Sequence, residues 1–252
     1  MFEDQDIRQV AMAELLCIVA KAAHLTRSLQ SSHASGHYTV SAFNGFHGCL
    51  FSARALMGLF GVFLVACDYK GREVNGLIDV FPWLGAVDQA KKFRKVHGGS
   101  NDLFYFRSFK PRIKSQDIWA VLARILRIVS MESVSDAERR KLQSFEYRRL
   151  SGPRNLFVYQ GPQWTWSYDR VFEASRYFEP SIRGWDMVAL LELAETEDFP
   201  EYILNGILFS TVEKALLEAF PHDAKGVIST LLFGVSPRES CYAKPPLSFL
   251  EG

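Results

Sequence analysis

The spacing of hydrophobic positions predicts a mainly helical chain that begins with two long helices. Apolar residues recur at helical intervals over residues 5–30, and a polar run at 31–36 ends this pattern. Residues 37–67 are apolar almost all round, as in the central helix of a bundle. A shorter third helix is predicted at 75–81, because Pro82 cannot continue it.

The second predicted helix is unusual in its small residues and its lack of charge. Gly45, Gly48, Gly58 and Gly61 are poor helix formers, but they would let a neighbouring helix approach closely. The uncharged run at 55–67 is about 13 residues long, whereas a membrane-spanning helix needs about 20. We therefore expect a buried core helix and no membrane partner.

The middle of the chain mixes two kinds of pattern. Residues 103–109 are rich in strand-forming side chains but do not alternate cleanly with polar ones. Residues 115–131 place their apolar side chains on one face, which predicts an amphipathic helix. Ser135 and Glu138 have the spacing of a capping box, which would open a basic helix running to about Leu150.

The last third of the chain predicts further helices, at about 185–197, 201–220 and 223–233. A proline-containing arm, 236–252, follows them. The fold class expected from the whole pattern is mainly α, a helical bundle with extra C-terminal helices.

Charge is sorted along the chain, and this sorting bears on the partner. Residues 91–154, here the basic segment, hold 16 Lys/Arg and 6 Asp/Glu, while residues 169–223, the acidic segment, hold 12 acids and 4 bases. A basic segment of this kind suits a phosphate-rich partner, and the acidic segment suits a basic protein or a second copy of the chain.

Two interpretations of the basic segment remain open. Its clustered bases could contact nucleic acid, or they could form a solvated face that the acidic segment neutralises within the fold. The residues predicted to bind nucleic acid from this segment are Lys91, Lys92, Arg94, Lys95, Arg139, Arg140, Arg148 and Arg149.

Common catalytic and metal motifs are absent from the sequence. There is no phosphate-binding Gly-rich loop and no His-Glu-x-x-His zinc motif. His33 and His37 have the i, i+4 spacing of a metal pair, but Gly36 lies between them and no third ligand is evident, so no metal or cofactor is predicted. Four scattered cysteines and an acidic N-terminus favour a reducing, cytoplasmic location.

A short motif at the end of the basic segment suggests a family. The run Arg154-Asn-x-x-Val-Tyr159 resembles the Arg-Asn-x-x-Val-His signature of HEPN domains, which are small helical bundles, many of them RNA-cutting proteins of toxin–antitoxin, CRISPR and anti-phage systems. Residues 46–56 are similar to a Phe-His-Ala-Ala-Arg-Ala-Leu helix of several such proteins, with extra residues in the spacing. The likeness covers at most residues 5–160.

The resemblance implies a site and a reaction. It implies that Arg154 and the residue at 159 form a catalytic pair across a dimer interface, promoting attack of a ribose 2′-OH on the adjacent phosphate without a metal. Asn155 would orient the backbone. Tyr159 stands where the family has His, and because tyrosine has a pKa of about 10 it is a poor base at neutral pH. RNA contact is therefore a firmer expectation than cleavage.

A second interpretation of the same segment is a small β-hairpin. Residues 156–160 and 164–168 flank a Gly-Pro turn, and the second arm alternates aromatic and small polar residues at strand period. In a hairpin, Trp164 and Trp166 would fill a core edge; beside a basic surface they would offer stacking faces for single-stranded nucleic acid. Helix and hairpin both remain open here.

Two functional hypotheses of different classes follow. The first is an RNA-contacting HEPN-like protein of a prokaryotic or phage defence or toxin system, with a bundle at 1–160 and an acidic helical part at 161–252, or one domain throughout. It would be a weak or inactive metal-independent endoribonuclease, acting as a homodimer or with a partner protein. The second is a non-enzymatic helical adaptor or subunit of a protein or ribonucleoprotein assembly.

Overall fold

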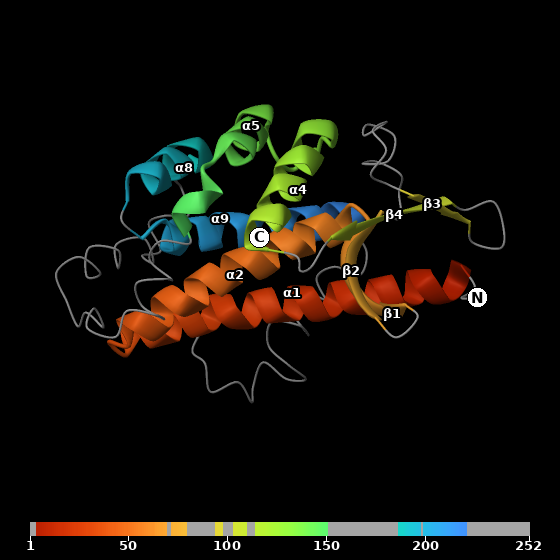
Figure 1. The fold of residues 1–252 in the computed structure, drawn as a ribbon. Helices are drawn as coiled ribbons and strands as arrows, with labels where there is room; N and C mark the ends of the chain where they lie inside the picture. The colour runs from red at the N-terminus through yellow and green to blue at the C-terminus, as the bar shows by residue number, and fades with distance from the viewer. Residues whose placement is uncertain are drawn as a thin grey trace.

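The computed structural model of the chain describes seven stretches, and it is mainly helical (Figure 1). These stretches are residues 4–69, 72–79, 94–97, 103–109, 114–150, 186–197 and 199–220. The predicted hairpin at 156–168, the helix at 223–233 and the arm at 236–252 lie outside the described residues.

Two long antiparallel helices form the base of the molecule (Figure 1). Helix α1 (Asp4–Ala34) continues through most of the polar run that was predicted to end it, and Gly36, with a φ of 74°, makes the turn into α2 (Tyr38–Leu59). A positive φ strains any residue that has a Cβ atom, so glycine is required in this turn. The prediction of two long N-terminal helices is confirmed.

The second helix is shorter than predicted, and the third predicted helix is wrong. Helix α2 stops at Leu59, where Gly61 takes a φ of 76°, and the chain continues as strand β1 (Val62–Tyr69). Residues predicted as a short helix at 75–81 lie mostly in β2 (Arg72–Asp79), which pairs antiparallel with β1. Short apolar runs have no periodicity that separates helix from strand, so pairing with a neighbour decided both cases.

The two strands belong to a four-stranded antiparallel sheet with the order β1-β2-β4-β3. Strand β4 (Leu103–Phe109) pairs with both β2 and β3 (Arg94–His97), so the run rich in strand formers is a strand. The sheet is inserted between α2 and the helices that follow, and it lies at one end of the α1–α2 pair (Figure 1).

The remaining helices pack above and along this pair. Helix α4 (Ser115–Ile128) buries one apolar face, as predicted. Helix α5 (Asp136–Ser144) opens with the predicted capping box but ends earlier than expected and is followed by a short 3-10 helix, η1 (Tyr147–Leu150). Both predicted later helices are confirmed as α8 (Met187–Thr196) and α9 (Pro200–Ala219).

Helix α9 is the centre of the core. It packs along α2 and is buried on nearly all sides, while α4, α5 and α8 lie together on one side of the α1–α2 pair (Figure 1). Fully buried leucines from four elements meet there, including Leu56, Leu122, Leu191 and Leu204. Among the described helices, none combines the length and the hydropathy that a membrane crossing requires.

Candidate functional site

All three predicted catalytic residues, and the two tryptophans predicted to contact nucleic acid, lie outside the described residues. Arg154, Asn155, Tyr159, Trp164 and Trp166 all follow the last described residue of η1, Leu150. Lys91 and Lys92, which precede β3 in the sequence, also lie outside. For these seven residues the sequence predictions stay predictions.

Three further predicted nucleic-acid contacts are placed by their backbone. Arg94 and Lys95 begin β3, opposite Phe106 and Tyr105 of β4. Arg148 lies within η1. The sheet therefore carries two of the predicted bases and the 3-10 helix carries the third.

The short helix η1 is held firmly in the core. The Tyr147 hydroxyl donates a hydrogen bond of 2.7 Å to the Leu142 carbonyl, and its ring stacks on Trp119 with centroids 4.5 Å apart. Burial raises the pKa of Tyr147, and the neighbouring Cys49 thiol adds to this. Leu150, at the end of η1, is 1% exposed. Leu150 is thus held in the core, four positions before Arg154 in the sequence.

Helix α5 brings its basic side chains onto acceptors of the same chain. Arg139 donates to the Leu126 carbonyl at 2.8 Å and pairs with Asp136 at 2.7 Å, and the hydrogen bond from Arg139 lowers the pKa of Asp136. Lys141 pairs with Glu195 of α8 at 2.8 Å. For Lys141, the internal neutralisation that the sequence left open is present.

Two other arginines of this region donate to carbonyl groups, and the charge of Arg140 also helps to lower the pKa of the Asp136 carboxyl. Nε of Arg140 donates to the Asp136 carbonyl at 3.2 Å, and Nη2 of Arg149 donates to the Glu197 carbonyl at 3.2 Å. Glu197 caps the C-terminus of α8, where the helix dipole attracts a cation. A carbonyl carries only a partial charge, so the Arg149 guanidinium keeps most of its attraction for an anion, whereas Asp136 already takes up part of that of Arg140.

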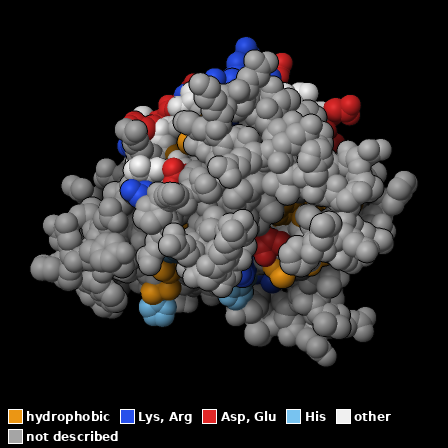
Figure 2. Space-filling view, turned by 45° about the vertical axis from the view of Figure 1, so that its right-hand side comes forward, with side chains coloured by type: hydrophobic (Ala, Val, Ile, Leu, Met, Phe, Trp, Pro, Cys, Tyr) orange, Lys and Arg blue, Asp and Glu red, His pale blue; other side chains and the backbone are white. Residues whose placement is uncertain are grey.

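Basic and acidic side chains alternate on this side of the molecule. Figure 2 shows Lys/Arg and Asp/Glu side chains next to one another along the upper edge, where α4, α5 and α8 lie in Figure 1. One base of the acidic segment, Lys214 of α9, lies 3.8 Å from an acid of the basic segment, Glu138 of α5. The surface is therefore mixed rather than uniformly positive.

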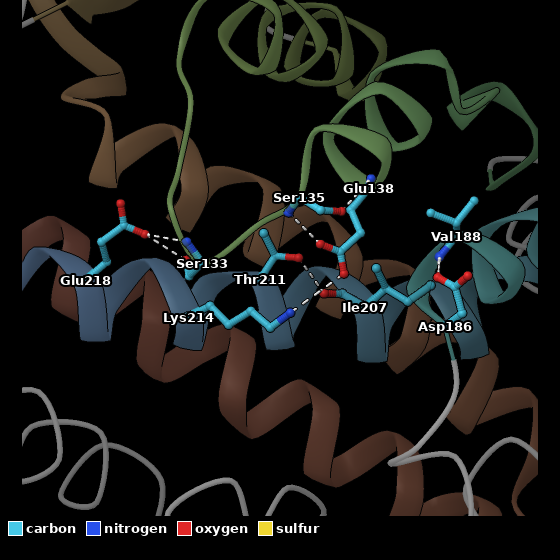
Figure 3. Close-up of polar contacts among 9 residues, drawn as sticks. All are labelled: Ser133, Ser135, Glu138, Asp186, Val188, Ile207, Thr211, Lys214 and Glu218. Atoms are coloured by element: carbon cyan, nitrogen blue, oxygen red, sulfur yellow. Dashed lines mark hydrogen bonds and ion pairs between the residues drawn. The ribbon is translucent and has the colours of Figure 1, made fainter.

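A loop before α5 is fastened to the C-terminal end of α9 (Figure 3). The Glu218 carboxylate accepts hydrogen bonds from the Glu132 N–H at 3.0 Å, the Ser133 N–H at 3.1 Å and the Ser133 hydroxyl at 2.7 Å. Burial opposes ionisation of Glu218, but these hydrogen bonds outweigh it and lower its pKa. The α4–α5 connection is thereby fixed relative to the core helix.

A polar seam between α2 and α9 was not predicted. Glu201 and Asn205, each 1% exposed, lie on α9 against Gly45 and Gly48 of α2. The Cys49 thiol donates to the Glu201 carbonyl at 3.6 Å. Burial raises the pKa of Glu201 to about 8 and raises that of Cys49 as well. The glycines of α2 were the feature of the sequence that could have indicated this seam. The predicted close approach of a neighbouring helix is confirmed at Gly45 and Gly48.

The two histidines with metal-pair spacing lie in different surroundings. His33 is buried, packs edge-on against the Tyr202 ring with centroids 5.5 Å apart, and has a pKa lowered by burial. His37 is exposed in the turn between α1 and α2. Within the described stretches, no group of three or more His, Cys, Asp or Glu side chains is arranged to hold a metal ion.

No protein-family model matches this chain, and neither the curated proteins nor the solved structures contain a significant match to it.

Proposed function

We propose that this chain is an RNA-contacting helical protein of HEPN type, belonging to a prokaryotic or phage defence or toxin system. The observation that carries the proposal is the anchoring of η1. Tyr147 and Leu150 fix the chain in the core immediately before the Arg154-Asn-x-x-Val-Tyr159 motif. A site presented from a fixed support keeps the geometry that phosphate recognition needs.

In this proposal the motif residues have separate roles. Arg154 binds the scissile phosphate, Asn155 orients the backbone and Tyr159 occupies the acid–base position, in a cleft shared by two copies. Tyrosine ionises at a pKa of about 10, so cleavage at neutral pH is slow. The proposed reaction needs no metal, as the family resemblance implies. RNA binding is then the principal activity and cleavage a weak one.

The arginines around η1 extend the contact. Arg149 donates to a carbonyl group and retains its charge for phosphate. Arg139 and Lys141 contribute less, because carboxylates of the same chain already engage them. This difference gives a matched pair for testing, since Arg149 and Lys141 belong to the same surface region.

The binding test is a titration of single-stranded RNA across a salt series. We expect Arg149→Ala to weaken binding and to reduce the log–log salt slope by about 1, as the loss of one phosphate contact does. Lys141→Ala should change both quantities less. Affinity that does not depend on salt would contradict phosphate contact altogether.

The cleavage test compares the wild-type chain with Arg154→Ala in the presence of a chelator. Slow cleavage that survives the chelator and disappears in the variant supports the proposed site. Restoring the histidine that the family signature has, by Tyr159→His, should accelerate cleavage. Activity that ignores Arg154, or that stops with chelator, would contradict the mechanism.

A second candidate is a non-enzymatic helical adaptor. The ion pair Lys141–Glu195 favours it, because it neutralises one base of the basic segment within the chain. The salt titration separates the two candidates. An adaptor that docks on protein would show no salt-dependent RNA affinity and would co-purify with a protein instead of RNA.

A further inference from the structure

Helix α9 approaches α2 closely at two glycines. A Cβ atom at Gly45 would lie 3.1 Å from Cγ of Glu201, and a Cβ atom at Gly48 would overlap the Asn205 side-chain amide. Glu201 and Asn205 are one helical turn apart on α9, so their side chains follow the same line of contact. The seam between α2 and α9 thus contains two polar side chains beside these glycines.

These polar groups are buried without full compensation. Among the described residues, Oε2 of Glu201 and Nδ2 of Asn205 have no hydrogen-bond partner. A carboxylate in such surroundings is costly, whereas its protonated form is tolerated, because desolvation penalises only the charged state heavily. The seam is therefore compatible with a neutral Glu201 and strained by an ionised one.

Among the residues that the structure describes, the titratable groups placed around Glu201 bring no positive charge to it at neutral pH. Burial raises the pKa of Cys49 on α2 and of Tyr147 on η1, so both stay neutral. Burial lowers the pKa of His33 on α1, which lies beside Tyr202. The charged residues of α8 are all acidic. A hydrogen bond from its own backbone N–H favours the carboxylate, but burial outweighs it.

We propose that proton loss from Glu201 loosens α9 from the α1–α2 pair, which makes the seam a pH-operated contact built into the core. With the proton in place, α9 is seated on Gly45 and Gly48. Without it, the carboxylate gains more from water than from the seam, and the N-terminal part of α9 separates from α2. This inference is independent of RNA contact and goes beyond it.

The size of the effect follows from proton linkage. The Glu201 pKa is about 8 when α9 is seated, and a glutamate in water has a pKa of about 4.3. Between these values, the population of the separated state should rise about tenfold per pH unit for each carboxyl that titrates. Above pH 8 the rise should level off.

Hydrogen exchange of backbone amides tests the proposal. We expect protection in α2 and in the N-terminal half of α9, corrected for intrinsic exchange rates, to fall as the pH rises from 5 to 8. In the isosteric variant Glu201→Gln, the change in protection with pH should lose the contribution of one carboxyl, which is about tenfold per pH unit. A variant with the wild-type dependence would overturn the proposal, as would a wild-type chain without any.

Two control variants and one direct measurement complete the experiment. Glu218→Gln makes the same chemical change at an exposed position of α9 and should leave the pH dependence as it is. Gly48→Ala should raise exchange at every pH without changing the slope. If Glu201→Gln does not fold, carboxyl ¹³C NMR of the wild-type chain decides: a Glu201 midpoint near 8 supports the proposal, and one near 4.5 overturns it.

Discussion

The ring of Tyr147 lies parallel to the indole of Trp119, with centroids 4.5 Å apart and planes inclined by 4°. Trp119 belongs to the first turns of α4 and Tyr147 begins η1, so this stack joins the amphipathic helix to the chain that leads toward Arg154. Phe145 adds an edge-on contact to the same tyrosine at 5.2 Å. An aromatic cluster therefore holds η1 in place.

Removing parts of this cluster should have graded effects on stability. Trp119→Ala should lower the free energy of unfolding by about 3–5 kcal/mol, because it removes a buried indole and leaves a cavity. Tyr147→Phe keeps the stack but loses the hydrogen bond to Leu142, which should cost about 0.5–1.5 kcal/mol. Urea unfolding measures both, and equal effects from the two variants would contradict the dominance of the aromatic packing.

Two glycine substitutions should act in opposite directions. Gly48→Ala places a methyl group on the Asn205 amide and should destabilise the fold by about 1–3 kcal/mol through overpacking. Gly206→Ala, within α9, meets no atom within 4 Å and should stabilise the helix by about 0.5–1 kcal/mol. Thermal unfolding of the two variants, followed by circular dichroism, checks the sign of each change.

The buried carboxyl of Glu213 predicts a decline of stability with rising pH. Burial raises its folded-state pKa to about 8, while the unfolded chain titrates near 4.3. The folded state therefore holds a proton that the unfolded state has lost, and its contribution is fully present below about pH 4.3 and lost as the pH rises toward 8. The slope for one carboxyl is at most about 1.4 kcal/mol per pH unit.

The variant Glu213→Gln isolates this contribution. It keeps the shape of the side chain and has no proton to lose, so unfolding free energies measured from pH 4 to 9 should fall less steeply than in the wild-type chain. Glu218 serves as the comparison, because hydrogen bonds from Ser133 and Glu132 lower its pKa and its variant should shift stability near pH 4 instead. Parallel curves for Glu213→Gln and wild type would refute the prediction.

The ion pair between Lys141 and Glu195 should contribute little to stability but should be measurable. Both side chains are partly exposed, at 22% and 34%. A double-mutant cycle with alanine at both positions should give a coupling of about 0.2–1 kcal/mol, because solvent screens partly exposed pairs. The coupling should shrink at high salt, and a coupling that is unchanged in 1 M salt would show that charge is not its source.

The sequence predicted the elements whose signals are local. The periodicity of α4 and the capping box of Ser135 and Glu138 both correspond to what the structure contains, with hydrogen bonds of 2.7 and 3.2 Å closing the box. These features depend on residues three or four positions apart, so neighbours in sequence are sufficient to specify them. The later helices α8 and α9 were predicted for the same reason.

The predictions failed where distant residues decided the conformation. The end of α2 and the short helix predicted at 75–81 gave way to β1 and β2, whose residues pair from Val62 with Asp79 to Tyr69 with Arg72. An apolar run of eight residues is compatible with helix and strand alike. The choice between helix and strand depended on pairing with the facing strand, and the periodicity of a short segment does not encode that pairing.

The sequence by itself determined a mainly helical protein, its two long N-terminal helices and the glycines at which another helix could approach. Only the tertiary structure decided that the approaching helix is α9, that Glu201 and Asn205 occupy the seam, and that Lys141 meets Glu195 from 54 positions away. Helix formation is governed by contacts within one or two turns, whereas burial and pairing of charge depend on which distant surfaces the fold brings together.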